Sequence, residues 1–336
     1  MTPRLKEHPP ITATRSDLVQ RLIAIYFIYS IDNVANVELR QLEYFIAVAS
    51  EMNFSRAAQR VRVVQSALST SVGKLEKELG VELFDRSRQQ ITITPAGELF
   101  REHARRVIHT ARLAKDAISD YRGQLSGIVE FGSLISFSTL DVPEILGNFH
   151  RDYPLVQIRL RNTLPGRAAH LTAIADGSLD LALVSAPDRF PSSIEMRLLA
   201  KEPMLFVCRP DHRLAGREHI DIAELAEEDL LGFPSDVGLR RVVENAFTAS
   251  GITPRTPYEV PVDLSLAARL VRHGLGSIFL PASETGRFQD LIAVPVLPVV
   301  HWTIFLAWSR HERMGPASAK FAELLLAATD SNVHDE

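Results

Sequence analysis

The sequence has very little cysteine and no long apolar run. Cys208 is the one cysteine among 336 residues, which excludes an intrachain disulfide framework and a metal site built from several cysteines. A reducing, cytoplasmic location is therefore expected. The apolar run at residues 22–29 is far shorter than the roughly 18 residues that a membrane span needs. No small-residue cleavage site follows it, so we expect neither a membrane span nor a signal peptide.

Catalytic and cofactor-binding motifs are also missing. The sequence contains no HExxH, GxSxG or Walker A pattern, and Gly274-Leu275-Gly276 does not continue into GxGxxG. The eleven histidines show no metal-ligand spacing. We therefore expect no enzyme activity, no cofactor and no metal site. Cys208 ends an apolar stretch and is interpreted as a small buried side chain, with a redox sensor as the alternative.

The charge is divided unevenly along the chain. The net charge is −4, yet residues 38–122 carry 14 Lys and Arg against 11 Asp and Glu, whereas residues 123–336 carry 19 against 27. Only the first of these segments has a sign suited to the approach of phosphate. The length and the 46% hydrophobic content predict two or three globular domains.

Residues 1–36 are interpreted as a disordered or misassigned N-terminal extension. They are polar and proline-rich at first and then briefly apolar, which allows at most one marginal helix. The domain-like pattern begins at Val37, and a GTG start codon would read as valine when translated internally. We hypothesise that translation begins at this position.

Residues 37–94 predict three helices followed by a small β-hairpin. Apolar residues recur at helical spacing across 38–51, and Ser55 is a good N-cap for a short second helix. A third helix is expected over 65–79 and should end at Gly80, which suits a left-handed C-terminal position. Its inward stripe comprises Leu68, Val72, Leu75 and Leu79.

The outward face of the third helix carries small polar side chains and one cation. Gln, Ser and Thr side chains can hydrogen-bond to base edges and phosphates, and Lys supplies charge. The alternating stretch 88–94 is expected to form a hairpin wing near phosphate or the minor groove. A solvated helix face is the alternative for each polar residue. The residues predicted to bind DNA are Arg56, Gln65, Ser66, Ser69, Thr70, Gly73, Lys74 and Arg88.

A long helix is predicted over 95–125, with Thr94 as N-cap and Pro95 at its first position. Apolar residues recur along it at alternating intervals of four and three, which is a heptad pattern. This pattern favours a two-stranded seam over packing on the helix's own domain. A homodimer would read two half-sites about one helical turn, or a multiple of it, apart. The predicted seam residues are Phe100, Ala104, Val107, Ala111, Ala114, Ile118, Tyr121 and Leu125.

Beyond a hinge at 124–127, short apolar strands alternate with helices, which indicates an α/β domain with parallel sheets. Two sets of such units over 127–330 predict a hinged, two-lobed domain. Lobe I is expected at about 127–205 and 285–330, and lobe II at about 206–284. The expected strands are 128–134, 156–160, 179–184, 204–208, 230–233, 257–260, 277–280 and 301–307.

Candidate ligand-binding residues follow the strands of this domain. Ligands of open α/β sheets bind beyond the carboxyl ends of strands and at helix N-termini. A helix N-cap is the alternative for each serine and threonine. Arg159, Arg161 and Arg167 favour an anionic ligand, with solvated surface as the alternative. The candidates are Ser136, Phe137, Ser138, Thr163, Ser185, Phe233, Ser235 and Asp263.

The stretches ELRQLEYFIAVASEMNFSRAA, QSALSTSVGKLEKELGVELFDR and TPAGELF resemble the N-terminal domain of LysR-type transcriptional regulators. The resemblance is close over 38–125 and looser over the remainder. It implies an all-α winged helix-turn-helix domain, a dimerising linker helix and a periplasmic-binding-protein-like effector domain. It further implies homotetramers, double-stranded promoter DNA and a small-molecule effector as partners, and RNA polymerase if the protein is an activator.

The sequence departs from the family at the third helix. Val64 replaces a capping Ser or Thr, which costs ~1 kcal/mol of helix stability, and Gly73 costs about as much relative to Ala. Thr70 and Gly73 replace frequent cations, so we expect weaker nonspecific DNA binding. The alternative function is a solute-binding protein or an enzyme that uses the N-terminal helices only to oligomerise.

Overall fold

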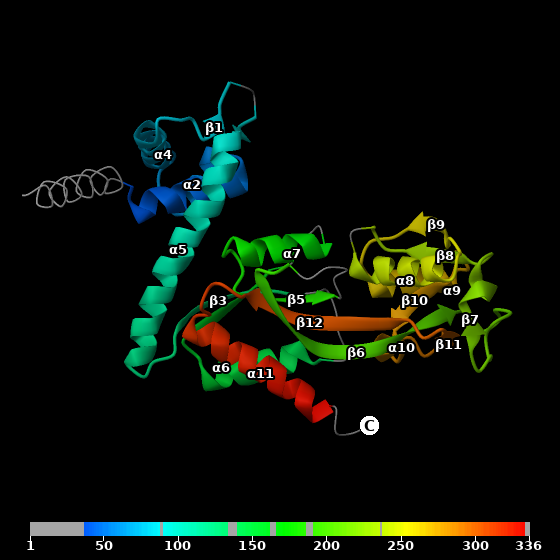
Figure 1. Cartoon of the computed structure of the whole chain (residues 1–336). Coiled ribbons are helices and arrows are strands. Elements are labelled where there is room, and N and C mark those ends of the chain that lie inside the picture. Colours follow the sequence, from blue (N-terminus) through cyan, green and yellow to red (C-terminus); the bar gives the residue numbers. More distant parts are fainter. Residues whose placement is uncertain are drawn as a thin grey trace, which may run out of the picture. The chain divides into compact units, whose positions relative to one another are not determined.

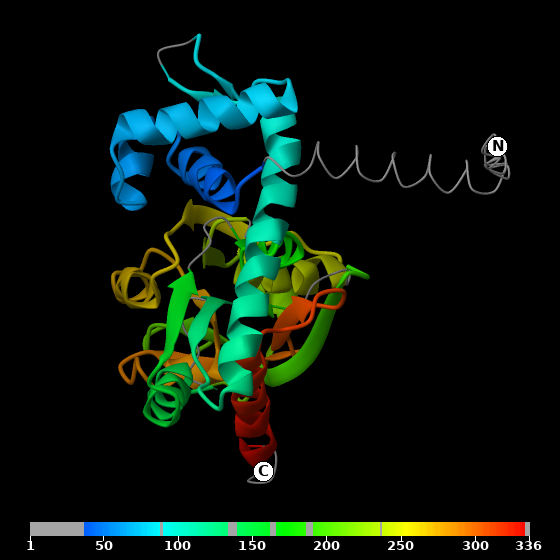
Figure 2. The same cartoon turned by 90° about the vertical axis from the view of Figure 1, so that its left-hand side faces the viewer.

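The computed structural model describes residues 37–87, 90–133, 140–161, 166–185, 191–235 and 237–332. The chain divides into two compact units that meet between Ile108 and His109, within the long helix α5 (Pro95–Tyr121). Figures 1 and 2 show α5 as one continuous helix. Among the described residues, no helix has the length and apolar character needed to cross a membrane. The predictions for residues 1–36 lie outside the described part.

The first unit consists of three helices, a hairpin and the first half of α5. Its three short helices are packed together at the N-terminal end of α5 (Figures 1 and 2). The elements before α5 are α2 (Leu39–Glu51), α3 (Phe54–Arg60), α4 (Gln65–Leu79), β1 (Phe84–Asp85) and β2 (Thr92–Ile93), with β1 and β2 antiparallel.

Local capping explains where these helices begin and end. Gly80 has φ +69° and ends α4, as its left-handed preference predicts. The Thr94 hydroxyl accepts a hydrogen bond from the Gly97 N–H at 3.0 Å and so caps α5. The prediction for Ser55 is wrong. The N-cap of α3 is Asn53, two residues before Ser55, and its side chain accepts from the Arg56 N–H, because α3 already begins at Phe54.

Aromatic rings fill the core of the first unit. The Phe45 ring lies 5.3 Å from the Phe84 ring and 5.1 Å from the Phe100 ring, centroid to centroid. Phe54 contacts Phe84 edge-on at 6.0 Å. Because these rings come from α2, α3, β1 and α5, the hairpin and the first half of α5 share one core with the short helices.

The second unit contains the second half of α5 and an eight-stranded mixed sheet. The sheet order is β4-β3-β5-β12-β6-β11-β7, and β10 also pairs with β6. Lobe I contains β3 (Gly127–Gly132), α6 (Val142–Asp152), β4 (Val156–Arg161), α7 (Gly166–Ala175), β5 (Leu181–Ser185), the first part of β6 (Ile194–Cys208), β12 (His301–Ser309) and α11 (Pro316–Asn332).

Lobe II is built around the end of β6. Strand β8 pairs with β9 as a separate parallel sheet. The elements are β7 (Ile220–Asp221), the 3-10 turn η1 (Ile222–Leu225), β8 (Asp229–Gly232), α8 (Gly238–Ala249), β9 (Arg255–Glu259), α9 (Leu264–Arg272), β10 (Ile278–Pro281), α10 (Ala282–Thr285) and β11 (Ile292–Leu297).

Strand β6 connects the two lobes without a break. Its residues up to Pro203 pair with β12, and its residues from Met204 onward pair with β10 and β11. Sequence reasoning predicted only 204–208 of this strand and missed β11. It also expected parallel sheets, whereas β12 runs antiparallel to both β5 and β6. Strand β11 pairs with the end of β6, from Ile292 opposite Cys208 to Pro295 opposite Leu205.

Helices cover both faces of the lobe I sheet. Helices α6 and α11 lie on one face and α7 on the other (Figure 1). The Phe321 ring of α11 packs edge-on against Phe131 of β3 and against Phe149 of α6, each at 5.1 Å. All three rings are fully buried, so they form the centre of the larger apolar core.

We predict that Phe321→Ala lowers the free energy of unfolding of the second unit by about 3–5 kcal/mol, because it leaves a cavity among buried rings. Urea denaturation followed by circular dichroism measures the loss. The neighbouring Lys320→Ala, at an exposed side chain, should change stability by no more than about 0.5 kcal/mol. Equal effects of the two substitutions would contradict this description of the core.

Candidate functional site

The outer face of α4 exposes a row of small polar side chains. Leu68, Val72 and Leu75 are fully buried on its inner face. Leu79, predicted to face inward, is 37% exposed, because it is the last residue of the helix. Of the predicted DNA-binding residues, Gln65, Ser66, Thr70 and Lys74 are exposed, and Ser69 and Gly73 are half-buried.

The hydroxyl-bearing residues of α4 line an open depression. Ser66, Thr70 and Lys74 line it together with Glu38 and Gln41 at the start of α2. Such a row of donors and acceptors with one ammonium group suits hydrogen bonding to base edges and phosphate. Val64 takes the N-cap position of α4, is 69% exposed and makes no side-chain capping bond. The first turn of α4 is therefore held without a side-chain acceptor.

Cations near α4 are partly engaged by carboxylates. Arg56 lies 3.7 Å from the Glu51 carboxylate and donates to its carbonyl at 2.6 Å, although its own side chain is 65% exposed. Sequence reasoning missed Arg62, which is exposed in the turn between α3 and α4 with φ +58°. A non-glycine residue in this left-handed conformation is uncommon, and sequence alone gave no indication of it. Arg88 lies outside the described residues.

The predicted seam residues of α5 have different surroundings in the structure. Ala104 is 1% exposed and the half-buried Phe100 packs on Phe45, so both belong to the core of the first unit. Leu125 lies beyond α5, which ends at Tyr121, and Gly123 turns the chain with φ +73°. Leu125 packs on the lobe I core. The other predicted positions are Val107, Ala111, Ala114, Ile118 and Tyr121.

Side-chain exposure agrees with an apolar contact surface on these remaining positions. Val107 is 52%, Ile118 58% and Tyr121 89% exposed in the single chain. Ala114 is also exposed and Ala111 is half-buried. Large apolar side chains exposed at heptad spacing suit a second helix.

The effector-domain candidates are divided between described and undescribed loops. Ser136, Phe137, Ser138 and Thr163 lie outside the described residues. Ser185 ends β5 and is 1% exposed. It faces Gly238, the first residue of α8 in the other lobe: a Cβ on Gly238 would lie 1.9 Å from the Ser185 Oγ and 3.3 Å from the Trp302 ring. Sequence reasoning missed Gly238, which allows the two lobes to approach here.

The remaining candidates have other surroundings. Phe233 is 3% exposed in the apolar core of lobe II, and Ser235 is exposed in the loop before α8. The Asp263 carboxylate accepts hydrogen bonds from the Ser265 and Leu266 N–H groups at 2.9 and 3.0 Å. Asp263 therefore caps α9.

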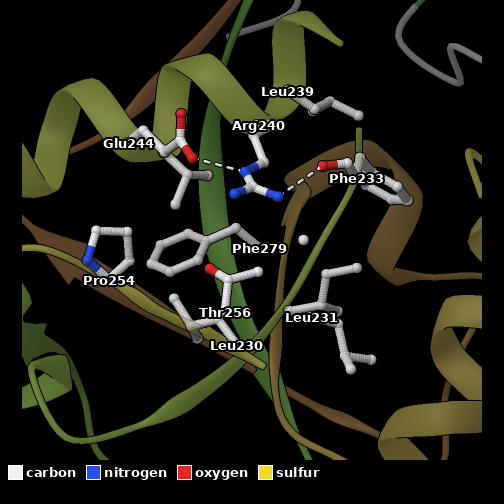
Figure 3. A pocket seen from close by; sticks show the side chains of 12 residues that line it. Leu230, Leu231, Phe233, Leu239, Arg240, Glu244, Pro254, Thr256 and Phe279 are labelled. Carbon is white, nitrogen blue, oxygen red and sulfur yellow. Dashed lines mark hydrogen bonds and ion pairs between the residues drawn. The ribbon is translucent and has the colours of Figure 1, made fainter. Parts of the chain in front are cut away.

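Lobe II contains a small apolar cavity (Figure 3). Leu231, Phe233 and Phe279 line it, and the Arg240 guanidinium enters it from α8. Arg240 donates to the Glu244 carboxylate at 2.6 Å and to the Phe233 carbonyl at 3.1 Å. The cavity volume of about 30 Å³ admits roughly one water molecule. As it stands, it does not hold a metabolite.

The predicted basic cluster is largely neutralised. Arg159 and Arg161 on the edge strand β4 contact the Glu130 carboxylate at 3.1 and 2.8 Å. Glu130 itself is 7% exposed on the neighbouring strand β3. These two arginines are therefore ion-paired and about half exposed, and the side chain of Arg167 lies outside the described part.

A winged helix-turn-helix followed by a long helix and a two-lobed α/β unit defines a DNA-binding transcriptional regulator with a ligand-binding domain. Comparison with known families specifies the class. Residues 39–98 match the family described as bacterial regulatory helix-turn-helix protein, lysR family, and residues 122–330 match the LysR substrate binding domain. The chain belongs to the LysR family.

Individual relatives agree with this assignment. The chain is 36% identical over 244 residues to the HTH-type transcriptional regulator ShiR of Corynebacterium glutamicum, covering 71% of this chain and 81% of that protein. It is similar to a cysteine variant of full-length OxyR from Pseudomonas aeruginosa (TM-score 0.68, 25% identity, 88% and 95% covered). It is also similar to full-length CbnR complexed with its target DNA (TM-score 0.61, 26% identity, 87% and 100% covered). These matches support a regulator over a solute-binding protein or an enzyme.

We predict that Val64→Thr raises the stability of the first unit by about 1 kcal/mol, because the hydroxyl can accept a hydrogen bond from the first turn of α4. Val64→Ala serves as the control, since it removes the same branched side chain without supplying an acceptor. Thermal denaturation compares the two variants. If threonine is no more stable than alanine at this position, the missing cap is not a weakness of this helix.

We predict that Cys208 in the native protein resists thiol reagents at neutral pH. Burial raises the pKa of the Cys208 thiol to about 11, and Glu228 and Asp211 add to the shift. Because the thiolate is the reactive form, modification by iodoacetamide should be negligible until the chain is unfolded in guanidinium. Mass spectrometry measures the modified fraction. Rapid labelling of the native protein would favour the redox-sensor alternative.

Proposed function

We propose that the chain is a cytoplasmic promoter-binding regulator whose DNA complex changes with a small-molecule effector bound between the lobes. It would read double-stranded DNA through the outer face of α4 together with Arg56, Arg62 and Arg88. The assembly would be a homodimer formed through α5 and a homotetramer built from two such dimers. RNA polymerase is a further partner if the regulator activates transcription.

The exposed polar face of α4 is the observation that carries the proposal. Its three buried aliphatic residues fix the orientation of the helix in the first unit, so the hydroxyl and amide groups of the other face point to solvent. Ser66, Ser69, Thr70 and Gly73 form this row, and the apolar side chain that lines the depression beside them is the small Ala67. That surface suits base edges in a major groove better than a protein core.

Dimerisation would compensate for the weak binding of one helix-turn-helix domain to a single half-site. The uncapped start of α4 and the small number of cations favour low affinity for a single half-site. A second copy held through the α5 seam makes binding of the second half-site effectively intramolecular, which raises the overall affinity. The similarity to CbnR in complex with its target DNA supports this mode of binding.

The effector would act through the contact between Ser185 and the start of α8. A ligand that fits between the lobes only in one arrangement shifts the population toward that arrangement through its differential affinity. The resulting movement of subunits would change the spacing of the DNA-reading dimers and the bend of the promoter. The effector need not be an anion, because Arg159 and Arg161 are paired with Glu130.

We predict that Ser69→Ala/Thr70→Ala weakens operator binding at least about tenfold without changing the melting temperature, because it removes hydroxyl contacts to bases or phosphates. The operator is first selected from random-sequence DNA and mapped by footprinting, which should show a roughly two-fold symmetric site. Fluorescence anisotropy then measures affinity at fixed salt.

Ser50→Ala is the matched control for this experiment. Ser50 is also an exposed helical serine of the first unit, but it lies on α2, where its hydroxyl donates to the Ile46 carbonyl. Its loss should leave operator affinity unchanged. Unchanged affinity in the α4 double variant, or failure to select any two-fold site, would count against the proposed function.

A further inference from the structure

The second half of α5 is seated on lobe I over three glycines. A Cβ on Gly127 would lie 2.7 Å from the Asp116 carboxylate, and one on Gly315 would lie 2.9 Å from Leu113 Cδ2. A Cβ on Gly177 would lie 3.2 Å from the His109 side chain. The three glycines lie at the start of β3, after α7 and before α11. The absence of side chains at the three positions allows α5 to approach the lobe closely.

A cluster of charged side chains holds α5 against lobe I next to these glycines. Asp180, immediately before β5, has a side chain that is only 2% exposed, and one of its carboxylate oxygens is paired with Arg112 Nη2 of α5. Its other oxygen accepts from the Glu130 N–H of β3 at 2.8 Å. The Ser318 side chain of α11 also bonds to this carboxylate. Asp180 therefore links α5 to both the sheet and the last helix of lobe I.

His109 extends the cluster toward another loop. Arg112 Nη2 lies 3.0 Å from His109 Nδ1, and because a guanidinium can only donate, Nδ1 accepts and the ring proton is on Nε2. That Nε2 faces the Glu312 carboxylate at 3.4 Å. Burial lowers the pKa of the imidazole, which agrees with a neutral ring. The residues His109, Arg112, Leu113 and Asp116 recur at helical spacing and form one face of α5, which we call the anchor face.

The anchor face lies opposite the dimer seam. With 3.6 residues per turn, Ala111, Ala114 and Ile118 point away from the side that carries His109, Arg112 and Asp116. A displacement of lobe I at the anchor face would therefore also displace the predicted seam, which lies on the opposite side of the same helix. Strand β5 connects the anchor face to the other lobe. Asp180 lies just before this strand, and Ser185 at its end contacts Gly238 of lobe II.

We propose that Asp180 is a positioning residue that couples lobe I to the dimer seam of α5, so that rearrangement at Ser185 changes the dimer rather than only the lobe. Removing its charge leaves the Arg112 guanidinium, whose side chain is 23% exposed, without its paired carboxylate. Breaking a buried pair from one side is strongly destabilising locally. The inference rests on the proposed dimer and its DNA binding, but its local part can be measured without DNA.

The local test is hydrogen exchange of full-length Asp180→Asn at pH 7, where the side-chain volume is retained and the charge is lost. Amides in peptides covering 109–121 should exchange about tenfold faster than in the wild type, as for a locally released helix. Val271→Ala, a cavity variant in the core of lobe II, is the control and should lower the melting temperature without accelerating exchange in α5. Unchanged exchange in Asp180→Asn would overturn the proposal.

The functional test measures the DNA bend in the complex with the selected operator by fluorescence energy transfer. Asp180→Asn should remain dimeric by light scattering and bind the operator, yet give a shifted or broadened bend distribution, whereas Val271→Ala should match the wild type. Arg112→Lys retains the charge without the planar fork and should be intermediate. Equal bending in all four proteins would overturn the coupling. Absence of operator binding by the wild type would instead overturn the proposed function.

Discussion

The second half of α5 carries charged residues on one face and apolar residues on the opposite face. The Arg112–Asp180 ion pair holds the charged face against lobe I. A buried carboxylate is tolerated only when a cation and hydrogen-bond donors replace its lost water. Asp180 receives both, from Arg112 and from the Glu130 N–H. With the charged face held against lobe I, the apolar face of α5 is the one left exposed. The exposure of the predicted seam thus goes together with a polar contact on the other side of the helix.

The DNA-reading unit is stabilised by its core more than by its helix ends. Four phenylalanines from different elements share one core, whereas α4 begins at Val64 without a side-chain cap. This arrangement fixes the orientation of the reading face while leaving its first turn only weakly held. Contacts to DNA phosphates would then complete the unsatisfied N–H groups at the start of α4.

One long strand, β6, runs through both lobes of the effector domain. Because β6 belongs to the sheets of both lobes, rotation of one lobe relative to the other must bend or twist that strand. The contact between Ser185 and Gly238 lies across the lobes and depends on the absence of a Cβ. The Ser185 side chain packs so closely on Gly238 that a larger residue at position 238 would not fit without a shift.

The sequence by itself determined the features that obey local rules. The limits of α4, the left-handed Gly80 and the cap by Thr94 follow from helical periodicity and capping, which act within a few residues. Helical spacing also predicted the long helix α5. Spacing could not show, however, that Phe100 and Ala104 belong to the core of their own unit. Only the tertiary structure decided that, together with the pairing of Arg159 and Arg161 with Glu130 and the docking of Arg112 on Asp180, because these partners lie far apart in the chain.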